Sequence, residues 1–153
     1  MYMVAAMGLK LYLPLALVAS VAATTGSDLI ARTSIAGQTL RQALGEHLHW
    51  ASVQAVGTLL LVAPFVAVAF ICALVAKRAR TRSAAGIFAA AMFTLLYFYF
   101  NGFQAAQQAL LEQKWTAAAL SVGLLPFFIG VPLLLIVAIA GALAAIFDRR
   151  MSD

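Results

Sequence analysis

Charged side chains are scarce in this 153-residue chain, where Asp, Glu, Lys and Arg together make up 10% of the residues. A soluble domain carries about 25% charged and about 45–50% apolar residues. This chain is 65% apolar, with a mean hydropathy of +1.00. A core built from so short a chain cannot hide that much apolar surface, so much of it must face lipid rather than water.

Cysteine is nearly absent, since Cys72 is the only one in the chain. A single thiol cannot form an internal disulfide or a CxxC redox centre. The sequence also lacks a glycine-rich phosphate loop, a nucleophile elbow and the HExxH pattern of zinc proteases. We therefore predict no catalytic set, no metal site and no cofactor, and no motif identifies a protein family.

The formal net charge is +5, and the sequence pI is about 9.9. Nucleic-acid binding requires basic side chains gathered on one solvated face. The largest basic group here is instead a short loop between two apolar runs, and the membrane explains such a loop better. We expect a lipid bilayer as partner and no nucleic acid.

Four apolar runs organise the chain, at residues 3–23, 50–76, 84–103 and 117–147. Each approaches or exceeds the roughly 20 residues that a helix needs to cross the hydrocarbon core. Strands are not expected, because alternating polarity is missing and backbone groups in lipid must pair within their own segment. The sequence predicts an all-α, polytopic integral membrane protein with four transmembrane helices in a single domain over residues 1–153.

The first run leaves two alternatives open. Lys10 divides it, and the small residues around Ser20 and Ala23 have the character of a signal-peptidase site. An uncleaved helix, with Lys10 extending toward the headgroups, explains the same residues more simply. Apart from Lys10, the predicted spans contain no ionisable side chain, and charges inside spans usually mark proton or ion paths.

Basic residues predict the orientation. With a cytoplasmic N-terminus, seven basic residues lie inside, namely Lys10, Lys77, Arg78, Arg80, Arg82, Arg149 and Arg150. Three lie outside, namely Arg32, Arg41 and Lys114. Positive residues are retained on the cytoplasmic side, so both termini are predicted to be cytoplasmic, in a bacterial inner membrane. The block formed by Lys77, Arg78, Arg80 and Arg82 decides this orientation and is expected to contact anionic lipid headgroups.

The connection over residues 24–49 is the longest between the runs, and a row of mostly apolar side chains recurs along it at steps of three and four. They are Leu29, Thr33, Ala36, Leu40, Leu44 and Leu48. This spacing predicts an amphipathic helix on the outer surface, capped by Thr25 and interrupted at Gly37 and Gly45. We expect a partner to dock there on outward-facing Arg32, Arg41 and His49, or else the helix only shields the bundle.

The last run is 31 residues long, about 46 Å as a straight helix, which exceeds the hydrocarbon thickness. Pro126 and Pro132 each remove a backbone donor, and Gly130 lies between them. A kinked helix is the simpler prediction. A broken helix that lines a binding cavity, as in transporters, is the alternative.

Polar side chains gather near the outer end of the third run, at Asn101, Gln104, Gln107 and Gln108. They are expected to form hydrogen bonds between helices. The alternative is a small outward-facing binding site on Asn101, Gln104 and Gln108, closed by Glu112 and His47. His47 and His49 point about 200° apart on a helix, so they are read as interfacial histidines rather than as ligands of one metal ion or haem.

For function, we expect a non-catalytic membrane protein that works through partners, as an accessory, assembly or protective subunit. The partner would be another membrane protein or a second copy of the chain. A small transporter or lipid-handling protein is the alternative, motivated by the proline-rich last run and the polar group near residue 101. A membrane-embedded enzyme is third.

Overall fold

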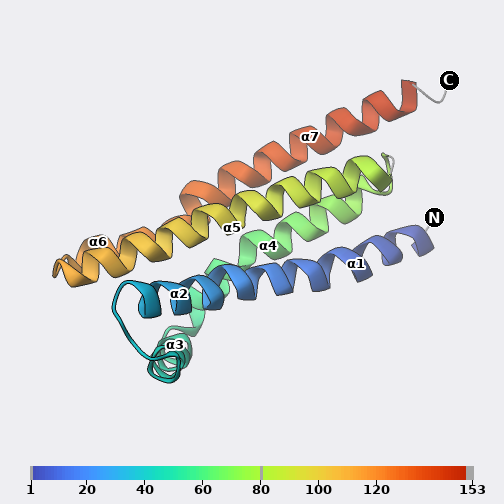
Figure 1. Cartoon of the computed structure of the whole chain (residues 1–153). Coiled ribbons are helices and arrows are strands. Elements are labelled where there is room, and N and C mark those ends of the chain that lie inside the picture. The colour runs from blue at the N-terminus through green and yellow to red at the C-terminus, as the bar shows by residue number, and fades with distance from the viewer. Residues whose placement is uncertain (1, 80, 151–153) are drawn as a thin grey trace.

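The computed structural model describes the backbone of residues 2–79 and 81–150, and the side chains of residues 8–79 and 81–148. Within these ranges the chain is helical and contains no strand, which confirms the all-α prediction (Figure 1). The elements in order are α1 (Tyr2–Val21), η1 (Ala22–Gly26), α2 (Ser27–Ser34), α3 (Leu40–Val53), α4 (Ala55–Val75), α5 (Thr81–Leu111), α6 (Trp115–Gly123), η2 (Pro126–Gly130) and α7 (Val131–Arg150). The η segments are short stretches of π-helix.

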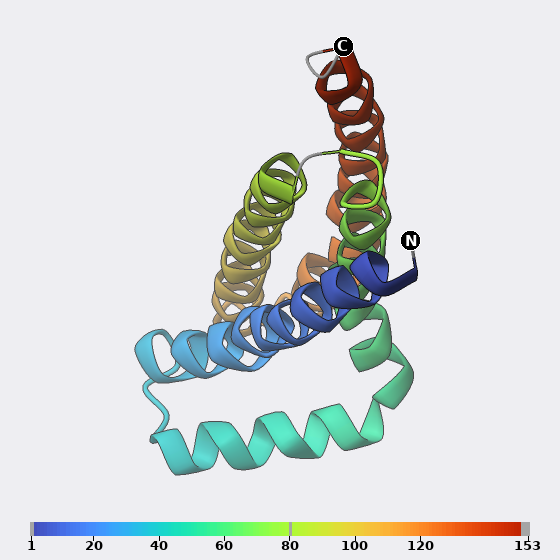
Figure 2. The same cartoon turned by 90° about the vertical axis from the view of Figure 1, so that its right-hand side faces the viewer.

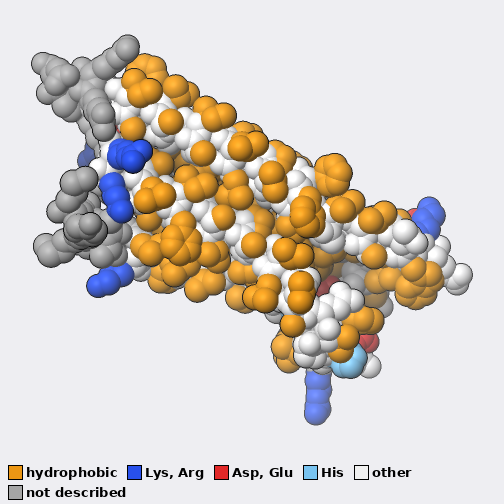
Figure 3. Space-filling model, turned by 180° about the vertical axis from the view of Figure 1, so that it is seen from behind, with side chains coloured by type: hydrophobic (Ala, Val, Ile, Leu, Met, Phe, Trp, Pro, Cys, Tyr) orange, Lys and Arg blue, Asp and Glu red, His pale blue; other side chains and the backbone are white. Residues whose placement is uncertain are grey.

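In the described part of the chain, four helical segments are long and apolar enough to cross a membrane. They are Gly8–Ser34, Ala55–Val75, Thr81–Leu111 and Trp115–Asp148. The number and order of the apolar segments agree with the sequence prediction. Their flanks are covered with hydrophobic side chains (Figure 3), and exposed examples such as Leu59, Phe93 and Ile139 are 61–73% accessible.

These segments run side by side, so that loops and termini collect at two opposite ends (Figures 1 and 2). The first end carries the start of α1, the turn between α4 and α5, and the end of α7; we call it the basic end. Lys77, Arg78 and Arg82 are exposed there, while Arg80 and the side chains of Arg149 and Arg150 lie outside the described residues. We call the other end, which carries α2, α3 and the turn between α5 and α6, the capped end.

Aromatic packing and close helix approach hold the segments together. Tyr99 of α5 is fully buried, its ring centroid lies 5.1 Å from that of Phe65 in α4, and its hydroxyl donates to the Leu61 carbonyl at 2.9 Å. At the contact between α4 and η2, a Cβ atom on Gly130 would lie 2.6 Å from Cγ of Pro64. Only a glycine permits the two segments to approach so closely.

The connection between the first two spans differs from the prediction in part, because it breaks at Gly37 as expected, whereas Gly45 lies inside α3 and does not interrupt it. α1 continues through η1 into α2, so Thr25 lies inside a continuous helical run and caps nothing. The chain turns at Gly37, which has a φ of +67° that favours glycine. Thr39 then caps α3, forming a capping box with Gln42.

Several boundaries also differ from the prediction. α3 extends through Trp50 to Val53, the chain bends at Gln54, and α4 begins at Ala55, so residues 50–53 belong to α3. α5 continues to Leu111, well beyond the predicted residue 103. The last segment is divided into α6, η2 and α7 around Pro126, because a proline cannot donate the usual helical hydrogen bond.

Candidate functional site

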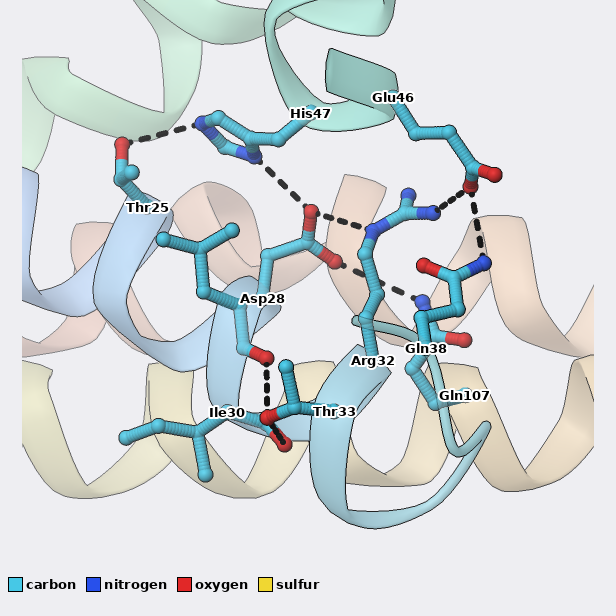
Figure 4. A network of polar contacts seen from close by, with 10 residues as sticks. Thr25, Asp28, Ile30, Arg32, Thr33, Gln38, Glu46, His47 and Gln107 are labelled. Carbon is cyan, nitrogen blue, oxygen red and sulfur yellow. Dashed lines mark hydrogen bonds and ion pairs between the residues drawn. The ribbon is translucent and has the colours of Figure 1, made fainter. Parts of the chain in front are cut away.

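Asp28 lies at the centre of a polar cluster at the capped end. Of the charged residues whose side chains the structure describes, Asp28 alone is buried, with 5% of its surface accessible. Arg32 Nε donates to Asp28 Oδ2 at 2.8 Å, and His47 Nδ1 lies 2.9 Å from the same oxygen. Gln107 Nε2 donates to Asp28 Oδ1 at 3.5 Å. The carboxylate therefore joins α2, α3 and α5 (Figure 4).

Helical spacing explains the contact between Asp28 and Arg32. Residues four apart lie on the same face of a helix, and an acidic residue that precedes a basic one at this spacing is the favourable order. The same guanidinium reaches α3, where Arg32 Nη1 lies 2.5 Å from Glu46 Oε2. Gln38 Nε2 donates to the same oxygen at 3.1 Å. Arg32 thus bridges the buried carboxylate of Asp28 and the half-exposed carboxylate of Glu46.

His47 uses both ring nitrogens within the cluster. Nδ1 contacts Asp28, and Nε2 lies 3.0 Å from the Thr25 hydroxyl of η1. In the neutral imidazole one nitrogen donates and the other accepts. Because the carboxylate can only accept, Nδ1 carries the hydrogen and the Thr25 hydroxyl donates to Nε2. We call the seven residues the Asp28 cluster: Thr25, Asp28, Arg32, Gln38, Glu46, His47 and Gln107.

Hydroxyl, imidazole and carboxylate follow one another here in the order of a hydrolase triad. An acyl-transfer site also needs N–H groups directed at the developing oxyanion. Thr25 lies within a continuous helical run, where backbone N–H groups are used in helical hydrogen bonds, and Asp28 is additionally paired with Arg32. The geometry therefore favours a structural role, in which Thr25, His47 and Asp28 connect helices, over a role of Thr25 as a nucleophile.

Burial of Asp28 is compensated within the cluster. Removing a carboxylate from water is costly unless it is paired and hydrogen-bonded. Arg32, with 12% of its side chain accessible, supplies the opposite charge, while His47 and Gln107 supply further donors. Among the described residues, no group of three or more His, Cys, Asp or Glu side chains could hold a metal ion.

The structure does not bring together the polar residues expected to form an outward-facing site. Asn101 is exposed and donates to the carbonyl of Tyr97 at 2.8 Å, within its own helix. Gln108 is exposed, whereas Gln104 is half-buried and its Nε2 has no hydrogen-bond partner. Their neighbour Gln107 is the residue that reaches the Asp28 cluster.

Glu112 does not close a site with His47. It pairs instead with Lys114 in the turn after α5, at 2.6 Å, and both side chains are exposed. The hydrogen bond and charge of Lys114 lower the pKa of Glu112, and Glu112 in turn raises the pKa of Lys114. This pair is a solvated surface contact.

The residues expected to dock a partner are separated by the fold. Arg41 and His49 are exposed on α3, but Arg32 points into the Asp28 cluster. The expectation of an outward-facing Arg32 is therefore wrong, because its guanidinium pairs with Asp28 and Glu46. Asp28 and Arg32 lie near the end of the helical run Gly8–Ser34, which carries the first candidate span.

Comparison with known proteins finds no matching family model, no matching curated protein and no matching solved structure.

Proposed function

We propose that the chain is a polytopic integral membrane protein of a bacterial inner membrane, in which the four apolar segments cross the bilayer. Exposed hydrophobic side chains along their flanks support this proposal. The basic end, with Lys77, Arg78 and Arg82, faces the cytoplasm together with both termini, because basic residues are retained on that side. The capped end then faces outward.

Within this setting, α3 lies in the outer membrane interface. Leu40, Leu44 and Leu48 form an exposed row along it, 41–64% accessible. Ala43 and His47 face the bundle from the adjoining side of the helix. An amphipathic helix of this kind places its apolar row among the acyl chains and its polar side in water.

We propose that the protein has no catalytic role and acts through a partner, as an accessory, assembly or protective component. The observation that carries this proposal is that the Asp28 cluster attaches α3 to α2 and α5 while Arg41 and His49 stay exposed. Arg41 precedes Ala43 by two positions, and His49 follows His47 by two. Two positions correspond to about 200° around a helix, so both residues lie on the side of α3 that faces away from the bundle. A fixed helix with an exposed polar side is suited to docking another membrane protein or a second copy of the chain.

Copurification in mild detergent tests this proposal. Reversing Arg41 and replacing His49, as R41E combined with H49E, should release a specific copurifying protein or dissociate a homo-oligomer. Lys114→Glu is the matched control, because it reverses an exposed charge at the same end and should leave the complex intact. If the double variant accumulates normally and retains every partner, the docking proposal is wrong.

A second candidate is a small transporter or lipid-handling protein. It is favoured by the two π-helical segments, Ala22–Gly26 and Pro126–Gly130, which interrupt the first and last candidate spans. Such interruptions are frequent at functional sites and at the binding sites of transporters. Liposomes that contain the purified protein and fluorescent phosphatidylcholine test the lipid-handling form, since scrambling would make the inner-leaflet lipid accessible to dithionite. Empty liposomes are the control.

A further inference from the structure

Few apolar contacts attach α3 to the rest of the protein. Ala43 is its only fully buried residue, and its large apolar side chains, such as Leu44 and Leu48, remain accessible. The helix is flanked by two points where the backbone can turn, at Gly37 with φ +67° and at Gln54 with φ −111° and ψ 49°. Its attachment therefore depends strongly on the Asp28 cluster.

The charges of that cluster do not cancel when His47 is neutral. Asp28 and Glu46 contribute two negative charges and Arg32 one positive charge, which leaves a net charge of −1. The other elements that pack here add no charge, because α4 has no Asp, Glu, Lys or Arg and α5 contributes the neutral Gln107. On α3 itself, Arg41 and His49 point outward. Glu112 and Lys114, in the turn after α5, pair with each other.

Proton uptake by His47 brings the net charge of the cluster to zero. Nδ1–H continues to donate to the Asp28 carboxylate, and the contact becomes an ion pair, because donor and acceptor then carry opposite charges. Nε2–H then donates to the Thr25 hydroxyl oxygen, which can accept as well as donate. No helix has to move to accept the proton.

We propose that α3 is a proton-controlled latch, which closes more tightly on α2 when His47 is protonated and loosens when His47 loses its proton. Histidine is suited to this role because its charge changes between about pH 5 and pH 8. The cluster can exchange protons with water, since about half of the Glu46 side chain is accessible. The inference concerns only how α3 is attached, so it stands whether or not α3 docks a partner.

Distances between spin labels on α3 and α5 test the latch. Labels are placed at G45C of α3, where an added side chain meets nothing within 4 Å, and at the exposed position Q108C, in a C72S background. The protein is held in nanodiscs of phosphatidylethanolamine and phosphatidylglycerol. We compare double electron–electron resonance at about pH 5.5 and about pH 8, which bracket histidine titration. One narrow distance is expected at the lower pH. At the higher pH the population of longer distances should grow several-fold. Identical distributions at both pH values would overturn the proposal.

Three variants show whether His47 is responsible. H47Q should remove the pH response, because the amide can donate and accept but does not titrate. H49Q is the matched control and should retain the response, since that imidazole is exposed two residues away. E46Q changes a half-exposed residue, so the fold should be kept. It makes the net charge of the cluster zero before His47 is protonated. The pH response of the distances should therefore shrink or reverse. An unchanged response in E46Q or H47Q, or its loss in H49Q, contradicts the latch.

Discussion

The Asp28 carboxylate and the His47 imidazole lie 2.9 Å apart, although 19 positions separate them in the chain. One belongs to the helical run that begins in α1, and the other belongs to α3, beyond the turn at Gly37. The contact ties a surface helix to a buried charge. It therefore couples the stability of the capped end to the ionisation of a few side chains.

Replacing Asp28 with Ala should strongly destabilise the protein. The substitution leaves the largely buried Arg32 with only the half-exposed Glu46 as an opposite charge, and breaking a buried ion pair on one side costs up to about 3–5 kcal/mol. The free energy of unfolding, measured by SDS titration in mixed micelles, should fall accordingly. Glu112→Ala removes one member of an exposed pair and should change nothing measurable. Equal effects of the two substitutions would show that the Asp28 cluster does not stabilise the fold.

Thr39→Ala should weaken the start of α3. It removes the capping box with Gln42, and the loss of such a cap costs about 1 kcal/mol. Hydrogen exchange at the first amides of α3 should become several-fold faster. Ser34→Ala serves as control, because the Ser34 hydroxyl only donates to the Ile30 carbonyl of its own helix. Unchanged exchange in Thr39→Ala would contradict the observed cap.

Two glycine substitutions should have opposite effects. Gly130→Ala places a methyl group against Pro64, and overpacking of this kind costs about 1–3 kcal/mol. Gly123→Ala meets nothing within 4 Å, so it should be neutral, or stabilising by up to about 1 kcal/mol through reduced backbone entropy. Thermal denaturation in detergent distinguishes them. A higher midpoint for Gly130→Ala than for Gly123→Ala would mean that α4 and η2 do not pack as described.

The proposed topology predicts the activity of reporter fusions. Fusions at Ser83 and Asp153 should be active only with a cytoplasmic reporter, because basic residues are retained on that side. Replacing Lys77, Arg78, Arg80 and Arg82 with glutamine should produce mixed orientation or loss of the protein. Lys114→Gln, which removes one basic residue from the opposite end, should leave the topology unchanged. A periplasmic reporter signal at Ser83 would overturn the orientation.

The apolar segments were predictable because the length and hydropathy of a membrane helix are local properties of the sequence. The start of α3 also had a local signal, since Thr39 followed by Gln42 has the spacing of a capping box. The prediction instead placed the cap at Thr25. In a helix that ran unbroken from Thr25, Asp28 and His47 would lie about 28 Å apart, so no spacing rule along one helix could have joined them.

The pairing of Asp28 with Arg32 was within reach of sequence reasoning, since the two residues are four apart on one helix. What the sequence could not show is which side of α2 faces α5. That choice depends on small residues such as Ala31 packing inward, and it brings Gln107 rather than Gln108 against the carboxylate. The residues that contact Asp28 from other helices are therefore determined by packing between segments that are distant in the sequence.

The crosswise placement of α3 has a consequence for membranes of different thickness. α3 runs across the long direction of the other helices (Figures 1 and 2). In the proposed topology its leucine row would define one depth in the bilayer. A helix in the interface resists both sinking and rising. Hydrophobic mismatch would then be absorbed at the opposite end, where the long stems of Lys77, Arg78 and Arg82 can extend or retract along the headgroups. The capped end, and with it the Asp28 cluster, would then stay at a constant depth relative to the outer surface of the bilayer, whatever the lipid chain length.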